Sequence, residues 1–405
     1  MKIAGIIAEY NPFHNGHAHH IERTKAKGAG CEATHIVAVM SGNYMQRGEP
    51  ALLPKRYRAA MALSGGADLV IELPLPWALG SAEQFAEGAV SLLDSLGCVE
   101  TVSFGSECGN IEALAAVAEK MDSPRFESLL RYHMESGISY PKARQQALRE
   151  IAGAAADLLD SPNNTLGIEY LRAIKRQGSS MEGFTVLRHG ASHESLAPVG
   201  TVASAAYIRS LCAEGRTVNA APYLPATSLK LLSAALEEGH APSKTALVER
   251  ALLFRLRSMT KEETAALPGV SEGLENRLYA AAREATGLED LLETVKTKRY
   301  PRTRLQRLVW AAYTGLTAQP TEALPPYIRV LAMNEKGKEI LAAARAARTY
   351  LTREMPLILR AADANKLTGY AANVWQQECV ADDRYALTLP TPLPCGTDYT
   401  DGLIK

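Results

Sequence analysis

Two histidines near the N-terminus, His14 and His17, have the residue type and spacing for chemistry on a phosphate group. They lie in the tetrapeptide HNGH, shortly after Pro12 ends an apolar run at residues 3–7. A strand that feeds a helix through a glycine-containing turn points backbone N–H groups at the helix start, where anions are favoured. Imidazoles at that position can donate hydrogen bonds to phosphate oxygens and stabilise the charge that develops in phosphoryl or nucleotidyl transfer. Gly16 is expected to let the backbone approach such a ligand closely.

Histidine pairs at this spacing also occur as surface or core residues without any chemical role. The context favours the chemical interpretation, because the pair follows the first predicted strand and opens a predicted helix. The sequence therefore predicts a nucleotide-binding turn at residues 14–17.

The elements that must position this turn alternate between strands and helices. Apolar runs predict strands over residues 3–7, 35–40, 68–73, 99–104 and 184–187. Strands of this length with helices between them indicate an α/β fold with a parallel sheet and helical crossovers. Ligands of such sheets bind at the carboxyl ends of the strands. Three groups that follow strands are therefore expected to face one crevice: His14, residues 41–43 and residues 105–107.

A segment with two prolines, residues 219–225, is a candidate linker between two domains. Residues 1–218 are expected to form the nucleotide-binding α/β domain, and residues 226–405 a mainly α-helical domain. Amphipathic stretches rich in alanine and leucine favour helices to near residue 370. The last thirty or so residues contain several prolines and are not assigned.

The composition of the 405-residue chain excludes several classes of protein. The formal net charge is zero, which argues against a surface coated in positive charge but leaves room for a local basic patch. The six cysteines form no CxxC pair and do not cluster with histidine at zinc-ligand spacing, so no metal site and no disulfide scaffold are expected. No apolar stretch approaches the roughly 20 residues of a membrane helix, and no signal peptide is evident. A cytoplasmic protein with reduced thiols and no membrane partner is expected.

Three later segments offer further polar groups to a nucleotide. Asn163 and Asn164 enter a predicted helix, where they either cap the helix or contact the ligand. Arg188 follows a predicted strand and offers a fixed cation to phosphate or ribose oxygens. Ser204 opens another predicted helix that also contains Arg209. A cap by Ser204 is compatible with ligand binding, because a capped helix start is also an anion site.

A dense basic run, KTKRYPRTRLQR over residues 296–307, lies in the predicted helical domain. It contains no acidic residue, although the chain as a whole has no net charge. Such a run is often a solvated face, but basic residues with one aromatic also suit a phosphate backbone and a stacked base. RNA contacts are therefore expected at Lys296, Lys298, Arg299, Tyr300, Arg302, Arg304 and Arg307.

The string EYNPFHNGH, which begins at Glu9, resembles the HxGH nucleotidyltransferase superfamily and, more narrowly, the bacterial tRNA(Met) cytidine acetate ligases. Residues 272–278 and the basic run resemble the same ligase family, so the resemblance extends over nearly the whole chain. Residues 203–209, ASAAYIR, are similar to the second phosphate motif of the superfamily, ISSTxIR. Ala206 stands where that motif has Thr, so the hydroxyl contact of that Thr is absent. The resemblance implies a Rossmann-like sheet that binds ATP through the HxGH turn.

The same resemblance implies which residues form the site. It implies that His14 and His17 are catalytic. ATP contacts are implied along the first strand, its turn and the start of the first helix, and at a few later positions. The sequence does not show which of Asn163 and Asn164 contacts ATP, so both are included. The implied contacts are Ile7, Ala8, Glu9, Tyr10, Asn11, Pro12, Phe13, His14, Asn15, Gly16, His17, Ala18, His19, His20, Gly105, Asn163, Asn164, Arg188, Ser204 and Arg209.

The implied reaction has two steps. Acetate attacks the α-phosphorus of ATP to give acetyl-adenylate and pyrophosphate. The N4 amine of the wobble cytidine of elongator tRNA(Met) then takes the acetyl group, giving N4-acetylcytidine and AMP. The first step needs positioning and charge stabilisation more than covalent help from the protein. Mg²⁺ is expected to arrive with ATP, because no carboxylate cluster marks a dedicated metal site in the sequence.

Two other functions stay open on the sequence alone. A nucleotidyltransferase that joins ATP to a small phosphorylated metabolite would release pyrophosphate without any RNA. A non-catalytic RNA-binding protein would bind tRNA without forming AMP. The sequence predicts neither the oligomeric state nor the groups that hold acetate.

Overall fold

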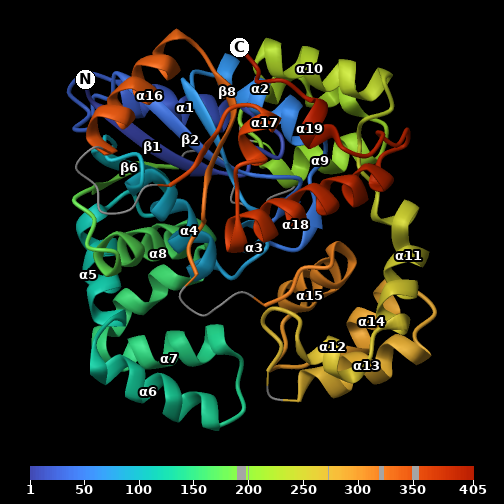
Figure 1. Ribbon diagram of the computed structural model, residues 1–405. Helices are drawn as coiled ribbons and strands as arrows, with labels where there is room; N and C mark the ends of the chain where they lie inside the picture. The colour runs from blue at the N-terminus through green and yellow to red at the C-terminus, as the bar shows by residue number, and fades with distance from the viewer. Residues whose placement is uncertain (189–197, 199, 272, 319–322, 349–354) are drawn as a thin grey trace.

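The sheet at the centre of the molecule contains the strands predicted from the sequence and two more (Figure 1). The computed structural model describes residues 1–188, 198, 200–271, 273–318, 323–348 and 355–405. Across the sheet the strand order is β7-β6-β1-β2-β5-β8-β9, and a small antiparallel ribbon, β3-β4, follows β2. The bounds are β1 Ile3–Ala8, β2 His35–Ser41, β3 Tyr44–Met45, β4 Glu49–Pro50, β5 Leu69–Leu73, β6 Thr101–Ser106, β7 Glu182–Leu187, β8 Ile328–Met333 and β9 Leu357–Ile358.

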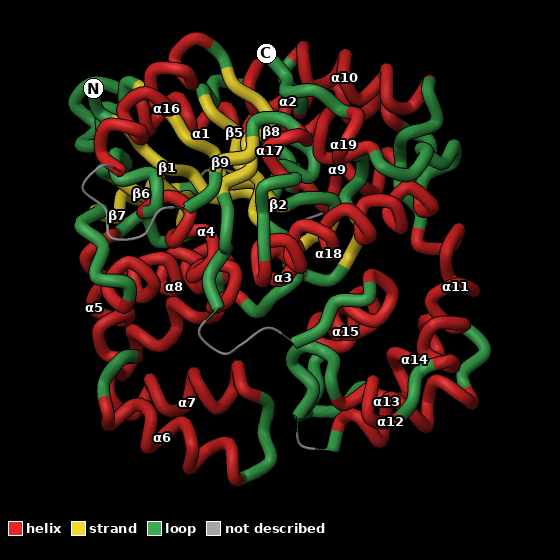
Figure 2. Tube along the Cα trace, viewed as in Figure 1, coloured by secondary structure: helices red, strands yellow, loops and turns green. Residues whose placement is uncertain are grey.

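Helices cover both faces of this sheet and build a separate lobe (Figure 2). Within the described part of the chain, no helix combines the length and apolar character that crossing a bilayer requires. The bounds are α1 Asn15–Lys25, α2 Lys55–Ser64, α3 Leu75–Ala78, α4 Ala82–Asp94, α5 Ile111–Met121, α6 Pro124–Glu135, α7 Tyr140–Ala152, α8 Pro162–Arg176, α9 Ala205–Ala213, α10 Ala226–Glu237, α11 Thr245–Ser258, α12 Lys261–Ala265, α13 Leu274–Glu284, α14 Leu288–Val295, α15 Arg302–Thr314, α16 Glu335–Arg348, α17 Ala361–Ala364, α18 Gly369–Tyr385 and α19 Thr397–Thr400.

Strand β1 lies in the middle of the sheet, where the strand order reverses. It pairs in parallel with β2 on one side and with β6 on the other. β2 continues in parallel to β5, and β6 to β7. The predicted α/β fold with a parallel sheet is confirmed. Since ligands of open parallel sheets bind beyond the carboxyl ends of the strands at such a reversal, the turn after β1 lies where a ligand is expected.

The central strands are apolar along their whole length because helices bury both of their faces. Every residue of β2 is buried, as in parallel strands covered on both sides. Alternate side chains face different cores. Val37 and Val39 belong to the core under α4 and α8, whereas Ile36 and Ala38 belong to the core under α1, α2 and α10.

Helices α11 to α15 form a lobe whose core continues into the β3-β4 ribbon, α3 and α18. Leu252, Leu278, Leu291 and Trp310 are buried in that core. Figure 1 shows this lobe below the sheet, beside the α6-α7 hairpin. The lobe meets the sheet domain where α15 packs against the β3-β4 ribbon, with the rings of Trp310 and Tyr44 at a centroid distance of 5.6 Å.

The predicted domain division is wrong on both sides of the α11–α15 lobe. Residues 328–333 were expected within a helical domain but form β8, which pairs antiparallel with β5. The following helices α16, α18 and α19 return to the sheet domain, and α10 also packs on it, against α2. The separate helical unit therefore spans α11 to α15 alone. A short 3-10 helix, Thr217–Tyr223, takes up most of the expected linker at residues 219–225.

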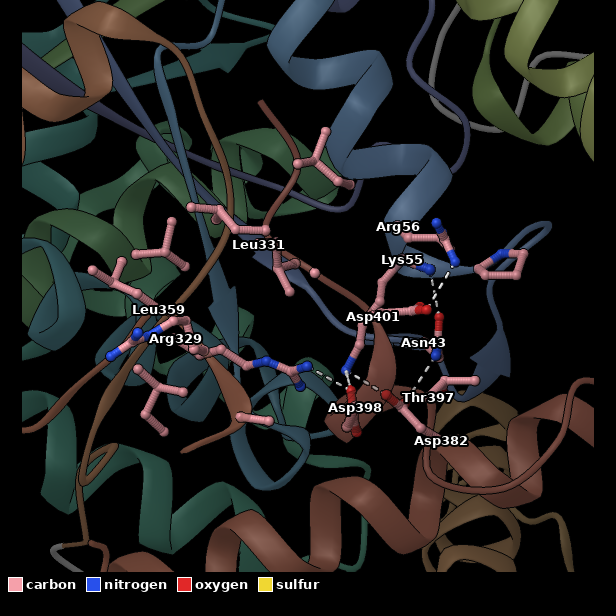
Figure 3. Close-up of a pocket in the computed structure, with 18 of the residues that line it drawn as sticks. Asn43, Lys55, Arg56, Arg329, Leu331, Leu359, Asp382, Thr397, Asp398 and Asp401 are labelled. Atoms are coloured by element: carbon pink, nitrogen blue, oxygen red, sulfur yellow. Dashed lines mark hydrogen bonds and ion pairs between the residues drawn. The ribbon is translucent and has the colours of Figure 1, made fainter. Parts of the chain in front are cut away.

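A buried cluster of charges joins this returning C-terminal segment to the sheet, and Figure 3 shows Lys55 and Arg329 pointing toward Asp398. The ammonium group of Lys55 lies 2.6 Å from Glu72 Oε1 and 2.9 Å from Asp398 Oδ1, and it also contacts Asp382. The guanidinium of Arg329 lies 2.8 Å from Glu72 and 2.7 Å from Asp398. These residues come from α2, β5, β8, α18 and α19, so the cluster ties five elements together.

Glu378 on α18 borders the same cluster and makes the stability of the folded chain depend on pH. Its Oε2 accepts a hydrogen bond from the backbone N–H of Leu75 at 2.6 Å. Burial, with the nearby charge of Glu72, raises the pKa of Glu378 to about 8. The folded chain thus holds a proton there that the unfolded chain, with an ordinary carboxyl pKa, has already lost.

We expect Glu378→Gln to flatten the fall in stability between pH 5 and pH 8. A raised folded-state pKa gives stability that is complete below the unfolded pKa of about 4.5 and is lost as the pH rises through 8. Glutamine still accepts from Leu75 and cannot ionise. In urea unfolding, the free energy of unfolding of the variant relative to that of the native chain should rise by at least about 1 kcal/mol from pH 5 to pH 8.

The control for this prediction is Glu335→Gln, because the side chain of Glu335 is 85% exposed. That variant should run parallel to the native chain at every pH. Parallel curves for Glu378→Gln as well would contradict the assignment of a shifted carboxyl to this position.

Candidate active site

His14 and His17 close the start of helix α1 with a capping box made of two imidazoles. Nδ1 of His14 accepts a hydrogen bond from the Gly16 N–H at 3.0 Å, and Nδ1 of His17 accepts from the His14 N–H at 3.2 Å. The rings are stacked, with centroids 3.7 Å apart. Since Nδ1 of each neutral ring acts as the acceptor, Nε2 of each ring carries the proton. The turn therefore holds two N–H donors in fixed orientation.

Gly16 is needed by the His14 ring. A Cβ atom at Gly16 would lie 2.9 Å from Cε1 of His14, closer than such atoms approach. This steric need is a second reason for glycine at this position, and the close approach of a ligand stays a prediction. Glycine at this position lets the imidazole fold back over the first turn of α1.

Two aromatic residues of the preceding turn hold the ring of His17. The centroid of that ring lies 4.9 Å from the ring of Tyr10, edge to face, and 5.5 Å from the ring of Phe13. Both aromatic rings are buried. Tyr10 has φ of +48°, a left-handed backbone conformation that costs about 1 kcal/mol for a non-glycine residue. The strained backbone of Tyr10 therefore lowers the stability of the turn, while the turn fixes the position of the His17 ring.

The loops after β1 and β2 are held by Arg58 of α2, which is fully buried. Its guanidinium donates to the carbonyls of Glu9 at 2.7 Å, Ser41 at 3.1 Å and Leu53 at 3.2 Å, and also to the carbonyl of Gly42. Burial lowers the pKa of Arg58 to about 10. The residue is a brace for the backbone that leads into the histidine turn, a role that the sequence does not predict.

Glu9, at the end of β1, connects the histidine turn to the β3-β4 ribbon. Its Oε1 accepts a hydrogen bond from the backbone N–H of Gln46 at 2.7 Å. Burial raises the pKa of Glu9, and the neighbouring Glu49 adds to the shift, although the hydrogen bond from Gln46 opposes it. A carboxyl group of this kind can act in proton transfer closer to neutral pH than an exposed one.

The second phosphate motif lies against the same turn. Ser204 caps helix α9 by accepting from the Tyr207 N–H at 3.0 Å, so the predicted cap is present. Arg209 donates to the carbonyl of Asn11 at 3.1 Å and pairs with Glu49 at 2.9 Å. The side chain of Asn15 donates to the carbonyls of Thr201 at 2.9 Å and Pro222 at 3.0 Å. The residues between β1 and α1 and the start of α9 are therefore brought together as predicted.

The two asparagines of α8 sit at the end of β6. Oδ1 of Asn164, which is buried, accepts from the backbone N–H groups of Glu107 at 2.9 Å and Cys108 at 3.1 Å. Asn163 is less buried and donates to the carboxylate of Glu107 at 2.6 Å. Neither asparagine caps α8, because the helix begins after Ser161 and Glu107 instead accepts from the Asn164 N–H. Asn164 thus shapes the loop, and Asn163 is the one nearer to solvent.

Gly105 and Arg188 meet at the neighbouring edge of β6 and β7. A Cβ atom at Gly105 would lie 3.2 Å from Cγ of Arg188, so the glycine gives the arginine side chain room to cross the strand. His20 of α1 lies close by, with Nε2 2.9 Å from Ser103 Oγ. Burial lowers the pKa of His20 to about 4, and the charge of Arg188 adds to the shift. These contacts place α1, Gly105 and Arg188 on one side of the reversal in strand order.

Residues 41–43 do not join this crevice as expected. Asn43 donates to Asp382 at 2.8 Å and accepts from the backbone N–H of Lys55 at 2.7 Å, so it belongs to the buried charge cluster. The cavity beside that cluster has a volume of about 60 Å³ (Figure 3). Ligand sites for molecules of nucleotide size have roughly 300–1,000 Å³. The cavity is therefore not the nucleotide site.

The basic run begins in the loop before α15 and continues into that helix, at the edge of the lobe that faces the sheet domain. Helix α14 supplies the acidic partners that the run itself lacks: Lys296 lies 3.1 Å from Glu293, and Arg302 lies 2.5 Å from Glu289. Tyr300 is 5% exposed and packs in the core of the lobe. The prediction that this ring stacks on a base is wrong, because its faces are covered by the lobe.

The comparison with known proteins agrees with this geometry. Residues 1–395 match the family model described as HIGH Nucleotidyl Transferase. The tRNA(Met) cytidine acetate ligases of Acetivibrio thermocellus and Caldanaerobacter subterraneus subsp. tengcongensis are 36% and 37% identical to the chain, and both alignments cover 100% of each sequence. The chain belongs to the tRNA(Met) cytidine acetate ligase family.

Solved structures extend the agreement to the HIGH nucleotidyl transferase fold. The crystal structure of apo Thermotoga maritima TmcAL matches with a TM-score of 0.91 at 31% identity. The crystal structure of the same protein bound with alpha-thio ATP matches with a TM-score of 0.89. Both matches cover 100% of both chains. The family resemblance read from the HxGH turn and the basic run is confirmed, and the fold of this acetate ligase family is that of the chain.

Proposed function

We propose that the chain is an ATP-dependent ligase that activates acetate as acetyl-adenylate and acetylates N4 of the wobble cytidine of elongator tRNA(Met). The observation that carries the proposal is the pair of fixed imidazole donors at the strand reversal. It is supported by full-length relatives that carry the ligase name and by a similar structure bound with alpha-thio ATP. We place its activity in the cytoplasm, where tRNA is found.

In the first step, an acetate oxygen attacks the α-phosphorus of ATP. The new oxygen–phosphorus bond forms as the bond to the β-phosphate oxygen breaks, and pyrophosphate leaves. The Nε2–H groups of His14 and His17 donate to the phosphate oxygens on which charge develops, and the capped start of α9 with Arg209 receives the remaining charge. Because the capping box fixes both rings before ATP arrives, little reorganisation is needed during the reaction.

Mg²⁺ arrives with ATP in this proposal. Among the described residues, three carboxylates lie close enough together to hold a cation: Glu72, Glu378 and Asp382. The ammonium group of Lys55 already sits among them, within the buried charge cluster. That triad is therefore a poor metal site, and the ion is expected to be bound by the triphosphate.

In the second step, the N4 amine of cytidine attacks the carbonyl carbon of acetyl-adenylate. The carbon–nitrogen bond forms, the bond from the carbonyl carbon to the phosphate oxygen breaks, and AMP leaves while the amine loses a proton. The base must leave its stack to reach the adenylate. We propose that the α11–α15 lobe, with Lys298, Arg304 and Arg307 of the basic run, holds the tRNA during this step.

The direct test is to incubate the protein with ATP, Mg²⁺, labelled acetate and tRNA. We expect one labelled acetyl group on tRNA(Met) for each AMP formed. Pyrophosphate release that needs a small phosphorylated metabolite and no RNA would favour a different nucleotidyltransferase. Tight tRNA binding without AMP would favour a non-catalytic RNA-binding protein. Either result, obtained with folded protein, would overturn the ligase proposal.

A further inference from the structure

The first two turns of helix α15 carry positive charge where a helix favours negative charge. The helix follows Pro301, which provides no side-chain cap, and its first turn contains no acidic residue. Arg302, Arg304 and Arg307 instead occupy this end of the helix. The unsatisfied N–H groups and the positive end of the helix dipole both disfavour cations there and favour an anion.

Two of these three arginines already have partners. Arg302 pairs with Glu289 at 2.5 Å and with Glu293 at 3.2 Å. Arg304 donates to the carbonyl of Gly269 at 2.8 Å and to the hydroxyl of Ser271 at 2.8 Å. The charge of Arg302 is neutralised within the lobe, whereas the guanidinium of Arg304 is oriented there by neutral acceptors and keeps its charge.

Arg307 differs from both. Within the described ranges, no ion pair or hydrogen bond engages its guanidinium, although the residue is partly buried. Burial lowers the pKa of Arg307 to about 10, and the charge of Arg304, one turn away, adds to the shift. A cation that has lost water without gaining a counter-ion is costly. Binding of an anion by this side chain would therefore be favourable.

The position of Arg307 links the lobe to the active site. A Cβ atom at Gly48 would lie 2.5 Å from the backbone nitrogen of Arg307, so the ribbon turn packs directly on the α15 backbone. The same ribbon contributes the Gln46 N–H that binds Glu9 at the end of β1. Long helical side chains generally lean toward the start of their helix, so the guanidinium of Arg307 is expected on the side of the uncapped start of α15.

We propose that Arg307, together with the uncapped start of α15, binds a phosphate of the tRNA backbone next to the cytidine that is acetylated. The planar guanidinium can donate two hydrogen bonds to one phosphate. This inference rests on the proposed function, because it names the tRNA group that meets this joint. Phosphates of ATP offer the same chemistry, but His14, His17 and Arg209 already face them in the proposed mechanism, and the test separates the two sources.

The test compares Arg307→Met with Arg302→Met in the full-length protein. For Arg307→Met we expect unchanged acetate-dependent ATP–pyrophosphate exchange, at least a tenfold lower kcat/KM for acetyl transfer to tRNA, and a slope of log K against log salt that is smaller by about 0.7–0.9, as for one lost phosphate contact. Arg302→Met should change the slope less, because its guanidinium is already paired. Arg307→Lys should recover part of the transfer activity.

Exchange activity serves as the folding control. A matching loss of exchange in Arg307→Met would assign the residue to ATP or to the fold and would overturn the inference. Unchanged transfer and unchanged slope would also overturn it. The slope is measured by binding alone, so a native chain that binds tRNA through Arg307 but forms no acetyl-adenylate would overturn the proposed function and leave the phosphate site standing.

Discussion

Replacing His17 with alanine is expected to lower acetate-dependent ATP–pyrophosphate exchange at least a hundredfold while leaving tRNA binding unchanged. Removing one preorganised donor to a developing charge typically costs about 10²–10³ in rate. The variant also loses half of the capping box, because Nδ1 of His17 accepts from the His14 N–H. That loss costs only about 1 kcal/mol of stability, which folded protein tolerates. The basic lobe does not involve this helix.

His14→Asn separates capping from chemistry. Asparagine is a good N-cap, so it can replace the hydrogen bond that Nδ1 of His14 accepts from Gly16, but it offers no donor at the position of Nε2. Exchange should fall as far as in His17→Ala, with less effect on stability. His133→Ala, on the distant helix α6, is the matched control and should retain full exchange. Full activity in His14→Asn would show that the imidazole serves the helix alone.

Replacing Lys55 with methionine is expected to lower the free energy of unfolding by about 3–5 kcal/mol, the range for breaking a buried ion pair from one side. Glu72, Asp382 and Asp398 would lose the ammonium group that they share. Arg329 alone would face those carboxylates. Because the cluster joins α2 to α18 and α19, the loss should appear as one cooperative shift in urea unfolding.

Lys338→Met is the comparison for this effect. Lys338 pairs with Glu335 at 2.6 Å on the surface, with a side chain 52% exposed. Surface pairs contribute about 0–1 kcal/mol, so this variant should unfold nearly like the native chain. Equal losses in both variants would show that the cluster around Lys55 contributes no more than a surface pair.

The strands around the histidine turn were predictable because their burial is written into the sequence as unbroken apolar runs. β2 is buried at every position and has no competing helical periodicity. β8 is also largely buried, but Arg329 interrupts its apolar residues and it lies among helical stretches. Its partner β5 is more than 250 residues away, in an antiparallel pairing. Periodicity describes local structure and contains no information on such a pairing.

In the candidate site, too, features set by local sequence were predictable and features set by tertiary packing were not. The HNGH turn was found because a strand, a turn and a helix start follow one another along the chain. The bracing role of Arg58 was not predicted, because its acceptors are backbone carbonyls of separate loops, which no side-chain pattern reveals. Tyr300 was misjudged because its burial depends on how five helices of the lobe pack. Local sequence patterns predicted the side chains that could contact a ligand, and tertiary packing determined which of these side chains are buried in a core.

The most direct measurement is a crystal structure of this protein with a non-hydrolysable ATP analogue and Mg²⁺. We expect Nε2 of His14 and of His17 within hydrogen-bonding distance, about 3 Å, of oxygens on the α- and β-phosphates, with the capping box of α1 intact. A triphosphate bound elsewhere, or imidazoles that turn from it into the core beside Tyr10 and Phe13, would contradict the account.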